Sequence, residues 1–179
     1  MRSALRKLRD DLRAKARWCY QDDSPRGLLK ALATDGTSAM ILYRLMQGSR
    51  EIGLAPLEMA FNKLNSAINA CVIGRGADLG PGFVIVHSHG VVINGKVRGG
   101  DNVVIEHEVT IGDSGVGACP VLGNGVYLGA GAKVIGPVSL GDGAKVGANA
   151  VVVHDVARDT TVVGIPARPV RRRNADGDA

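Results

Sequence analysis

The chain has 179 residues, of which 45% are hydrophobic but only 3% aromatic, and 25 are glycine. This length predicts one domain with a small appendage, and an aliphatic, glycine-rich core favours thin, regularly stacked layers. A formal net charge of +5 favours an anionic partner, and no apolar run is long enough to predict a membrane span.

The N-terminal stretch "MRSALRKLRDDLRAK" predicts an amphipathic helix. Leu5, Leu8 and Leu12 recur at helical spacing and, with Cys19, form an apolar stripe. Arginines and lysines, Lys15 among them, surround this stripe. We expect the stripe to pack in the core or against a second copy of the chain. The basic residues also allow a weak association with an anionic membrane surface.

Residues 1–70 as a whole carry helical patterns and predict an α-helical N-terminal region. Ser24, which is followed by proline, begins a second helix that Gly36 ends. Further helical patterns cover residues 37–47 and about 56–69.

The N-terminus and the cysteines bear on the location of the protein. Charged residues stand where a signal peptide needs an apolar stretch. Cys19, Cys71 and Cys119 are an odd number without the spacing of metal ligands, which favours a reducing compartment. We therefore expect a cytoplasmic protein that binds no metal.

From Ile73 onwards, apolar residues recur every six positions. The first block is Ile73, Leu79, Ile85, Val91, Val97, Val103 and Val109, and the second is Leu122, Leu128, Val134, Leu140, Val146 and Val152. A six-residue step fits a chain that turns a corner every six residues, so that three sides close one coil. Residues 71–170 are therefore expected to form a parallel β-helix, which makes the fold mostly β.

The segment 111–121, "IGDSGVGACPV", interrupts the repeat, because the step from Val109 to Leu122 is thirteen residues rather than six. A Gly- and Ser-rich interruption of a solenoid predicts an extruded loop, and such loops tend to carry function. After the repeat, residues 171–179 predict a flexible tail that is first basic and then acidic.

Three of the four histidines fall in one part of the repeat. With eighteen residues per coil, His89 and His107, which are eighteen positions apart, are expected to stack on adjacent coils. Both take a repeat position that holds only Ala or Val in the second block, and His87 falls at a corner beside them. Polar residues that break a regular pattern in one patch are expected at functional sites.

The stretch from Gly82 to Gly112, "GFVIVHSHGVVINGKVRGGDNVVIEHEVTIG", resembles the serine acetyltransferases within the hexapeptide-repeat acyltransferases. The resemblance continues through "LGAGAKVIGPVSLGDGAKVGANAVV" to "TTVVGIPARPV" and covers about residues 20–170. It implies a left-handed β-helix, a homotrimer, and acetyl-CoA as the acyl donor.

The same resemblance implies roles for residues of the donor half. The family's catalytic histidine aligns with His87, and a neutral imidazole is suited to remove the proton of a hydroxyl that attacks the thioester. The residues implied in acetyl-CoA binding are Ala130 and Ala148, next to the pantetheine arm, and Lys145, Arg168 and Arg171, near the phosphates.

The acceptor half departs from the family. Its orienting aspartate aligns with Val72, the aspartate before its catalytic histidine with Val86, and the Arg-His of its loop with Ala118 and Cys119. Serine is a zwitterion whose two ends need opposite charges. The expected acceptor is therefore a saccharide hydroxyl, as in the colanic-acid-type relatives of polysaccharide biosynthesis.

His89, His107 and Cys119 are the expected lining of the acceptor pocket. The group that orients His87 in place of an aspartate stays open. The candidates are His89, His107, Glu106, Glu108, Asn94 and a backbone carbonyl.

Serine O-acetylation in cysteine biosynthesis is the main alternative, because so much of the chain resembles that family. A β-helix carbonic anhydrase with zinc on three histidines is less favoured, since the ligand spacing of that group is absent. A non-catalytic trimeric module is the third alternative. Nucleic-acid binding is not expected, because basic residues are not interleaved with aromatic ones.

Overall fold

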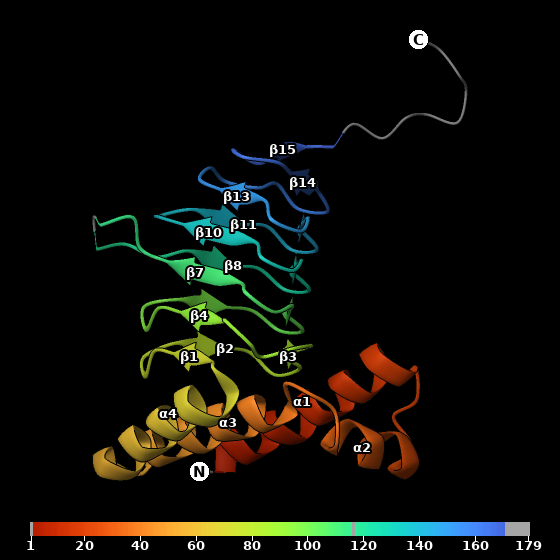
Figure 1. The fold of residues 1–179 in the computed structure, drawn as a ribbon, viewed down its shortest axis with the longest axis vertical. Helices are drawn as coiled ribbons and strands as arrows, with labels where there is room; N and C mark the ends of the chain where they lie inside the picture. The colour runs from red at the N-terminus through yellow and green to blue at the C-terminus, as the bar shows by residue number, and fades with distance from the viewer. Residues whose placement is uncertain (1, 116, 171–179) are drawn as a thin grey trace.

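The computed structural model of the chain describes residues 2–115 and 117–170. Within these residues, four helices come first and lie together at one end of a stack of short strands (Figure 1). They are α1 (Arg2–Tyr20), α2 (Pro25–Leu32), α3 (Thr37–Glu51) and α4 (Ala55–Asn69). No helix in the described part is long and apolar enough to cross a membrane.

The second helix begins as predicted but ends earlier. The Ser24 side chain accepts a hydrogen bond from the Gly27 N–H (3.4 Å) and caps the helix, which ends at Leu32. Gly36, predicted to end this helix, instead precedes α3 with a φ of +80°, a conformation that glycine adopts without strain. The residues between α2 and α3 therefore form a turn, and Asp35 lies on it.

Short strands follow the helices and cycle through three sheets, as a β-helix requires. Sheet A contains β1 (Val72–Ile73), β4 (Val92–Ile93), β7 (Thr110–Gly112), β10 (Lys133–Ile135) and β13 (Val151–Val152). Sheet B contains β2 (Asp78–Leu79), β5 (Arg98–Gly99), β8 (Val121–Leu122) and β11 (Ser139–Leu140). Sheet C contains β3 (Val84–Ile85), β6 (Val104–Ile105), β9 (Tyr127–Leu128), β12 (Lys145–Val146), β14 (Thr161–Val163) and β15 (Arg168–Pro169).

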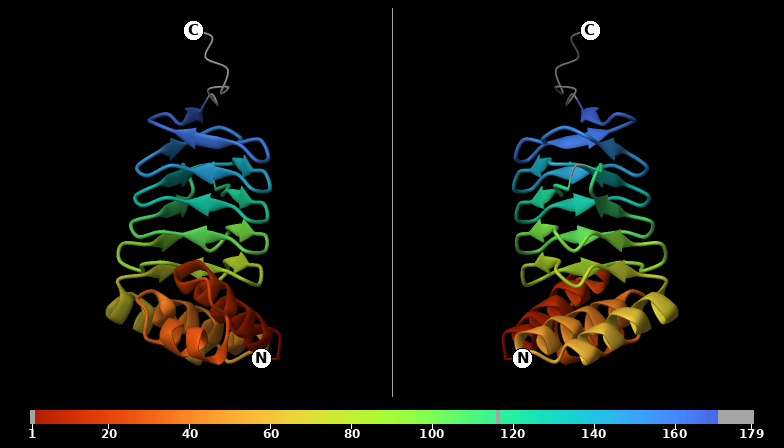
Figure 2. Two further views of the ribbon diagram at one scale, coloured as in Figure 1. Left: turned by 90° about the vertical axis from the view of Figure 1, so that its right-hand side faces the viewer. Right: turned by 90° about the vertical axis from the view of Figure 1, so that its left-hand side faces the viewer.

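The strands pair in parallel, except that β15 pairs antiparallel with β14. Two side views show the coils as an even stack above the helices (Figure 2). The prediction of a mostly β fold, with a parallel β-helix preceded by helices, is confirmed.

The repeat does not keep one register, and the alignment predicted for its first block is wrong at one corner. Ile73 pairs with Ile93 and Ile85 with Ile105, each twenty residues on rather than eighteen. The corner between β3 and β4 therefore holds two extra residues. Val91 and the valines at six-residue steps after it are also fully buried. Ile93, which pairs with the strand below, and Val91, two positions before it, are both apolar and buried. The apolar pattern alone therefore does not show which of the two continues the row of Ile73.

The second irregularity is the connection between β7 and β8, residues 113–120, which leaves the β-helix at the corner between sheets A and B. The Asp113 carboxylate accepts hydrogen bonds from the N–H groups of Gly115 (2.9 Å) and Gly117 (2.9 and 3.0 Å). Lys96 Nζ donates to the carbonyl of Gly117 (2.8 Å). The Asp113 contacts lie within the loop, and Lys96, which lies between β4 and β5, ties the loop to the coil below.

The buried face of α1 is not the leucine stripe predicted for it. Leu5 is 50% exposed, whereas Asp11 and Lys15 are fully buried. The helix packs on α3 and against β3. Buried charges are stable when each finds polar partners, and the open end of the β-helix supplies partners for both.

The first coil, β1 to β3, has carbonyls that no coil below it can use. In the coils above, strand carbonyls accept hydrogen bonds from the coil below; the Val86 N–H, for example, donates to the carbonyl of Ile105 (2.9 Å). No strand precedes β1 in the described part of the chain. Buried backbone carbonyls without a donor are costly, so this end of the β-helix needs a cap.

Side chains from three helices cap the three strands of the first coil. The caps are Asn62 Nδ2 to the carbonyl of Ile73 (2.7 Å), Arg44 Nη1 to that of Leu79 (2.9 Å) and Lys15 Nζ to that of Ile85 (2.6 Å). The position of the helices under the β-helix follows from these contacts and from the apolar core that they share.

Arg44 lies at the centre of the cap and is paired with Asp11. Its guanidinium donates to both carboxylate oxygens of Asp11 (2.6 and 3.1 Å) and also to the carbonyl of Gly80 (2.6 Å). Asp11 Oδ1 in turn accepts the N–H of Phe83 (2.9 Å). The ion pair is fully buried and joins α1, α3 and the first coil.

Replacing Asp11 by Ala leaves Arg44 as an uncompensated buried charge. We expect the free energy of unfolding to fall by about 3–5 kcal/mol. Asp10→Ala, which removes a partner of Arg9 from the surface of the same helix, should change it by less than about 0.5 kcal/mol. Urea unfolding at fixed protein concentration measures both, and equal midpoints for the two variants would show that the cap does not depend on this pair.

Candidate active site

The candidate active site lies on one edge of the β-helix, where the strands of sheet C end and the chain turns into sheet A. We call this edge the C–A corner. The residues that follow β3, β6, β9 and β12 there include His87, His107, Ala130 and Ala148. Tyr127 pairs with Lys145 in the strands just before Ala130 and Ala148, so these two alanines lie on adjacent coils of one edge.

His87, not His89, approaches His107. The ring centroids of His87 and His107 are 6.0 Å apart with an interplanar angle of 72°, an edge-to-face contact. The predicted stack of His89 on His107 is wrong, because the two extra residues of this corner shift the register. The His89 side chain is exposed, and its backbone carbonyl accepts the N–H of Glu108 (2.8 Å).

Asp35, from the turn between α2 and α3, is the carboxylate that meets His87. Its Oδ2 lies 2.9 Å from His87 Nδ1, and both side chains are about half exposed. The turn is pressed against β3, since a Cβ on Gly36 would lie 2.3 Å from the carbonyl of Ile85. None of the groups considered from the sequence orients His87 here. Asp35 stands 52 residues away in the chain, and no motif marks it.

The charge state of Asp35 sets the tautomer of His87. Partial burial alone raises the pKa of the Asp35 carboxyl, but hydrogen bonds from His87 and the Gly36 N–H, with the positive charge of Lys15, outweigh it and hold this pKa below its usual value. An ionised carboxylate only accepts hydrogen bonds, so His87 Nδ1 carries the proton. In the neutral imidazole, Nε2 then keeps a lone pair that can take a proton from a hydroxyl.

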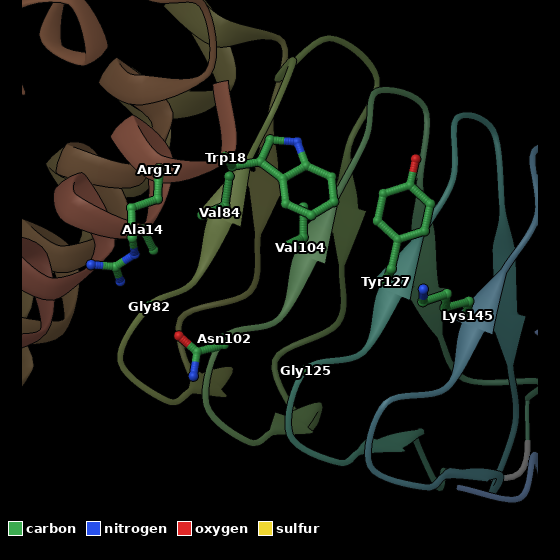
Figure 3. A pocket seen from close by; sticks show the side chains of 10 residues that line it. All are labelled: Ala14, Arg17, Trp18, Gly82, Val84, Asn102, Val104, Gly125, Tyr127 and Lys145. Carbon is green, nitrogen blue, oxygen red and sulfur yellow. The ribbon is translucent and has the colours of Figure 1, made fainter. Parts of the chain in front are cut away.

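A cleft of about 610 Å³ crosses the outer face of sheet C, between α1 and the strands that end at the C–A corner (Figure 3). Trp18 of α1 stacks on Tyr127, with ring centroids 5.6 Å apart and planes inclined by 24°. Burial, and then Glu106 nearby, raises the pKa of Tyr127, so its hydroxyl stays neutral. Lys145 adds a positive charge to the same wall.

The other residues predicted for the site lie elsewhere. Cys119 is in the connection between β7 and β8, at the corner between sheets A and B, so a single chain does not bring it to His87. Burial, followed by the charge of Asp113, raises the pKa of its thiol, which keeps the sulfur protonated. Arg168 is exposed in β15 at the far end of the β-helix. Arg171 lies outside the described residues.

No three His, Cys, Asp or Glu side chains within residues 2–115 and 117–170 gather as metal ligands would. His87 instead pairs with one carboxylate and one ring, in the manner of an oriented base.

Comparison with known proteins identifies the family. The bacterial transferase hexapeptide (six repeats) family matches residues 119–154. The serine acetyltransferase of Helicobacter pylori (strain ATCC 700392 / 26695) is 39% identical over 140 residues, which are 76% of this chain and 82% of that protein.

Two solved structures are similar over almost the whole chain. Soybean serine acetyltransferase complexed with serine has a TM-score of 0.83 and 36% identity, covering 95% of this chain and 70% of that one. The serine acetyltransferase of Brucella abortus strain S19 in complex with coenzyme A has a TM-score of 0.82 and 30% identity, covering 93% and 67%.

The chain belongs to the serine acetyltransferase family. The predicted left-handed β-helix is confirmed by this membership and by the superposition. As a member of this family of hexapeptide-repeat acyltransferases, the protein is an acyltransferase.

Replacing His87 by Ala removes the imidazole that Asp35 orients, and we expect acyl transfer to fall about 10²- to 10⁴-fold. His154→Ala is the control, because His154 is exposed on a later coil and should leave the rate within about twofold of wild type. Release of thiol from the acyl-CoA donor measures both rates. Transfer by His87→Ala at the wild-type rate would exclude His87 as the base.

Proposed function

We propose that the protein is an acetyl-CoA-dependent O-acetyltransferase that acetylates the hydroxyl of L-serine, with His87 as general base. The proposal rests above all on the pair of His87 and Asp35, which leaves Nε2 of the imidazole free to accept a proton. The serine-bound soybean relative and the CoA-bound Brucella relative support serine as acceptor and acetyl-CoA as donor.

In this reaction, Nε2 of His87 takes the proton of the acceptor hydroxyl while the oxygen attacks the carbonyl carbon of the thioester. The imidazolium that forms is stabilised by the Asp35 carboxylate at Nδ1. When the tetrahedral intermediate collapses, the carbon–sulfur bond breaks and the imidazolium returns its proton to the departing thiolate. The products are the O-acetyl ester and free CoA.

Acetyl-CoA is proposed to lie along the C–A corner, with Ala130 and Ala148 next to its pantetheine arm. Ala130 is half-buried and Ala148 is exposed, and their small side chains leave room for an arm against the backbone. Lys145, three residues before Ala148 and on the wall of the cleft, is proposed to attract the phosphates, as is Arg168 near the end of the β-helix.

Replacing Lys145 by Ala should raise the KM for acetyl-CoA by about fivefold at low salt, since an exposed ion pair contributes up to about 1 kcal/mol. The effect should shrink as ionic strength rises. Lys63→Ala, on the exposed face of α4, is the control. Steady-state rates at two salt concentrations measure the effect. Equal KM values for the two variants would show that Lys145 does not contribute to binding of acetyl-CoA.

A homotrimer is proposed as the active assembly. The connection 113–120 leaves the β-helix at the edge of sheet A opposite to the C–A corner, so a neighbouring chain can bring Ala118 and Cys119 to His87. Val72 and Val92 are 42% and 43% exposed on the outer face of sheet A, and apolar residues of this kind suit a subunit interface.

The cytoplasm is the proposed location, since the relatives are serine acetyltransferases by name and an odd number of cysteines without metal-ligand spacing favours a reducing compartment. The weak association of α1 with a membrane surface has no support from these comparisons.

A saccharide hydroxyl is the second candidate acceptor. The observation that favours it is the lack of charge at the acceptor positions: Val86 stands where the family has an aspartate, and Ala118 and Cys119 where its loop has Arg-His. A zwitterion needs charges of both signs, whereas a sugar needs hydrogen-bonding groups. The relatives favour serine over this candidate all the same.

The acceptor is tested by release of CoA thiol from acetyl-CoA, with L-serine as the added acceptor and His87→Ala as the blank for hydrolysis. Saturable release that depends on L-serine, with O-acetylserine as product, is the expected result. Release that depends on a monosaccharide instead would favour the second candidate. Release with neither, from protein that binds acetyl-CoA, would overturn both.

A further inference from the structure

We propose that Lys15 is a positioning residue that holds Asp35 and His87 in the geometry that proton transfer needs. The inference rests on the proposed function, in which His87 is the base. It adds to that function the group that keeps the two members of the pair together.

Lys15 donates all its hydrogen bonds to two segments that meet at the site, the turn with Asp35 and the end of β3. Its Nζ donates to the carbonyl of Asp35 (2.7 Å), to that of Ile85 (2.6 Å) and to that of Val86 (2.8 Å). An ammonium group has three N–H donors, so each has an acceptor. The side chain is fully buried.

The three carbonyls belong to the residues that place the proton-transfer pair. Asp35 carries the carboxylate that binds His87 Nδ1, and Val86 immediately precedes His87. One buried ammonium on α1 therefore fixes the distance between the turn that carries the acid and the corner that carries the base. Both side chains are about half exposed, so packing alone does not immobilise them.

Gly36 shows how closely the two segments approach each other. An added Cβ would lie 2.3 Å from the carbonyl of Ile85 and 3.0 Å from that of Val86, two of the three oxygens that Lys15 binds. The φ of Gly36 is also +80°, so glycine meets both requirements at this position. The ammonium and the glycine thus act on the same junction from two sides.

Lys15 does more than cap the end of the β-helix. Asn62 and Arg44 cap the other two strands of the first coil, and their strands carry no part of the site. Lys7, on the same helix, also donates to a first-coil carbonyl, that of Leu79 (3.3 Å), and pairs with Asp78 (3.0 Å). Of these caps, Lys15 is the one that also binds the residue whose carboxylate meets His87.

Burial and the neighbouring acidic groups act on the pKa of Lys15 in opposite directions. Burial lowers this pKa, and Cys19 on its own helix, Asp35 on the turn and Glu106 at the corner after β6 offset only part of the effect, so the pKa stays below its usual value. Loss of this proton would leave two N–H donors for three carbonyls, and the junction would loosen.

The test compares Lys15→Met with Lys7→Met, the same substitution on the same helix. With Lys15→Met we expect kcat for acetyl transfer to fall about 10- to 100-fold, as for a misplaced catalytic group, while the KM for acetyl-CoA stays within about twofold. Lys7→Met should leave kcat unchanged. Thermal unfolding of both variants records the loss of a cap separately from the loss of activity.

A double-mutant cycle asks whether Lys15 acts through Asp35. If it does, Lys15→Met added to Asp35→Asn should lower kcat no further than Asp35→Asn alone. Gly36→Ala separates the same two segments without changing Lys15, and it should lower kcat as Lys15→Met does. It replaces Lys15→Met in the test if that variant does not fold.

The ¹⁵N NMR signals of the His87 ring report the geometry without any acceptor. The wild type should carry its proton on Nδ1, and Lys15→Met should move part of the population to Nε2, whereas Lys7→Met should not. An unchanged tautomer and kcat in folded Lys15→Met would overturn the inference. If wild-type protein acetylates neither serine nor a saccharide, the proposed function fails, and the NMR comparison still decides the role of Lys15.

Discussion

The open end of the β-helix is the constraint on which the rest of this structure depends. The N–H groups of each coil donate to carbonyls of the coil above it. The first coil therefore has strand carbonyls without a donor from another strand, and an unpaired buried carbonyl costs free energy. Asn62, Arg44 and Lys15 meet this need, one for each strand. The need for donors explains why a helix with so many basic residues turns a charged face inward and leaves Leu5 half exposed.

The candidate active site lies next to this end cap. The chain reaches the C–A corner of the first coil directly after the strand that Lys15 caps, and the turn with Asp35 lies against that strand. A hydrogen-bond acceptor at Nδ1 orients an imidazole base, whichever part of the chain supplies it. Where the resemblance places an aspartate at position 72, this chain has Val72, and a carboxylate from the helical region lies at His87 instead.

The sequence predicts which residues lie on adjacent coils in the second block of the repeat but not in the first. Ala130 and Ala148, eighteen residues apart, lie on adjacent coils of one edge, because the second block of the repeat runs eighteen residues per coil without interruption. His89 and His107 were paired wrongly, because two extra residues enter the corner between β3 and β4 and the rows on either side are equally apolar. A one-dimensional pattern fixes the period but not the place of an insertion between two equivalent rows.

The sequence by itself determined the class of fold and the N-cap of α2 at Ser24, since these depend on local periodicity and on local hydrogen bonds. Tertiary structure decided which groups surround His87. Asp35 lies 52 residues from it in the chain and Lys15 lies 70 residues from the carbonyl of Ile85, and no periodicity connects such positions. Lys15 fits the pattern of a solvated lysine, and only the unpaired carbonyls at the end of the β-helix make burying it favourable.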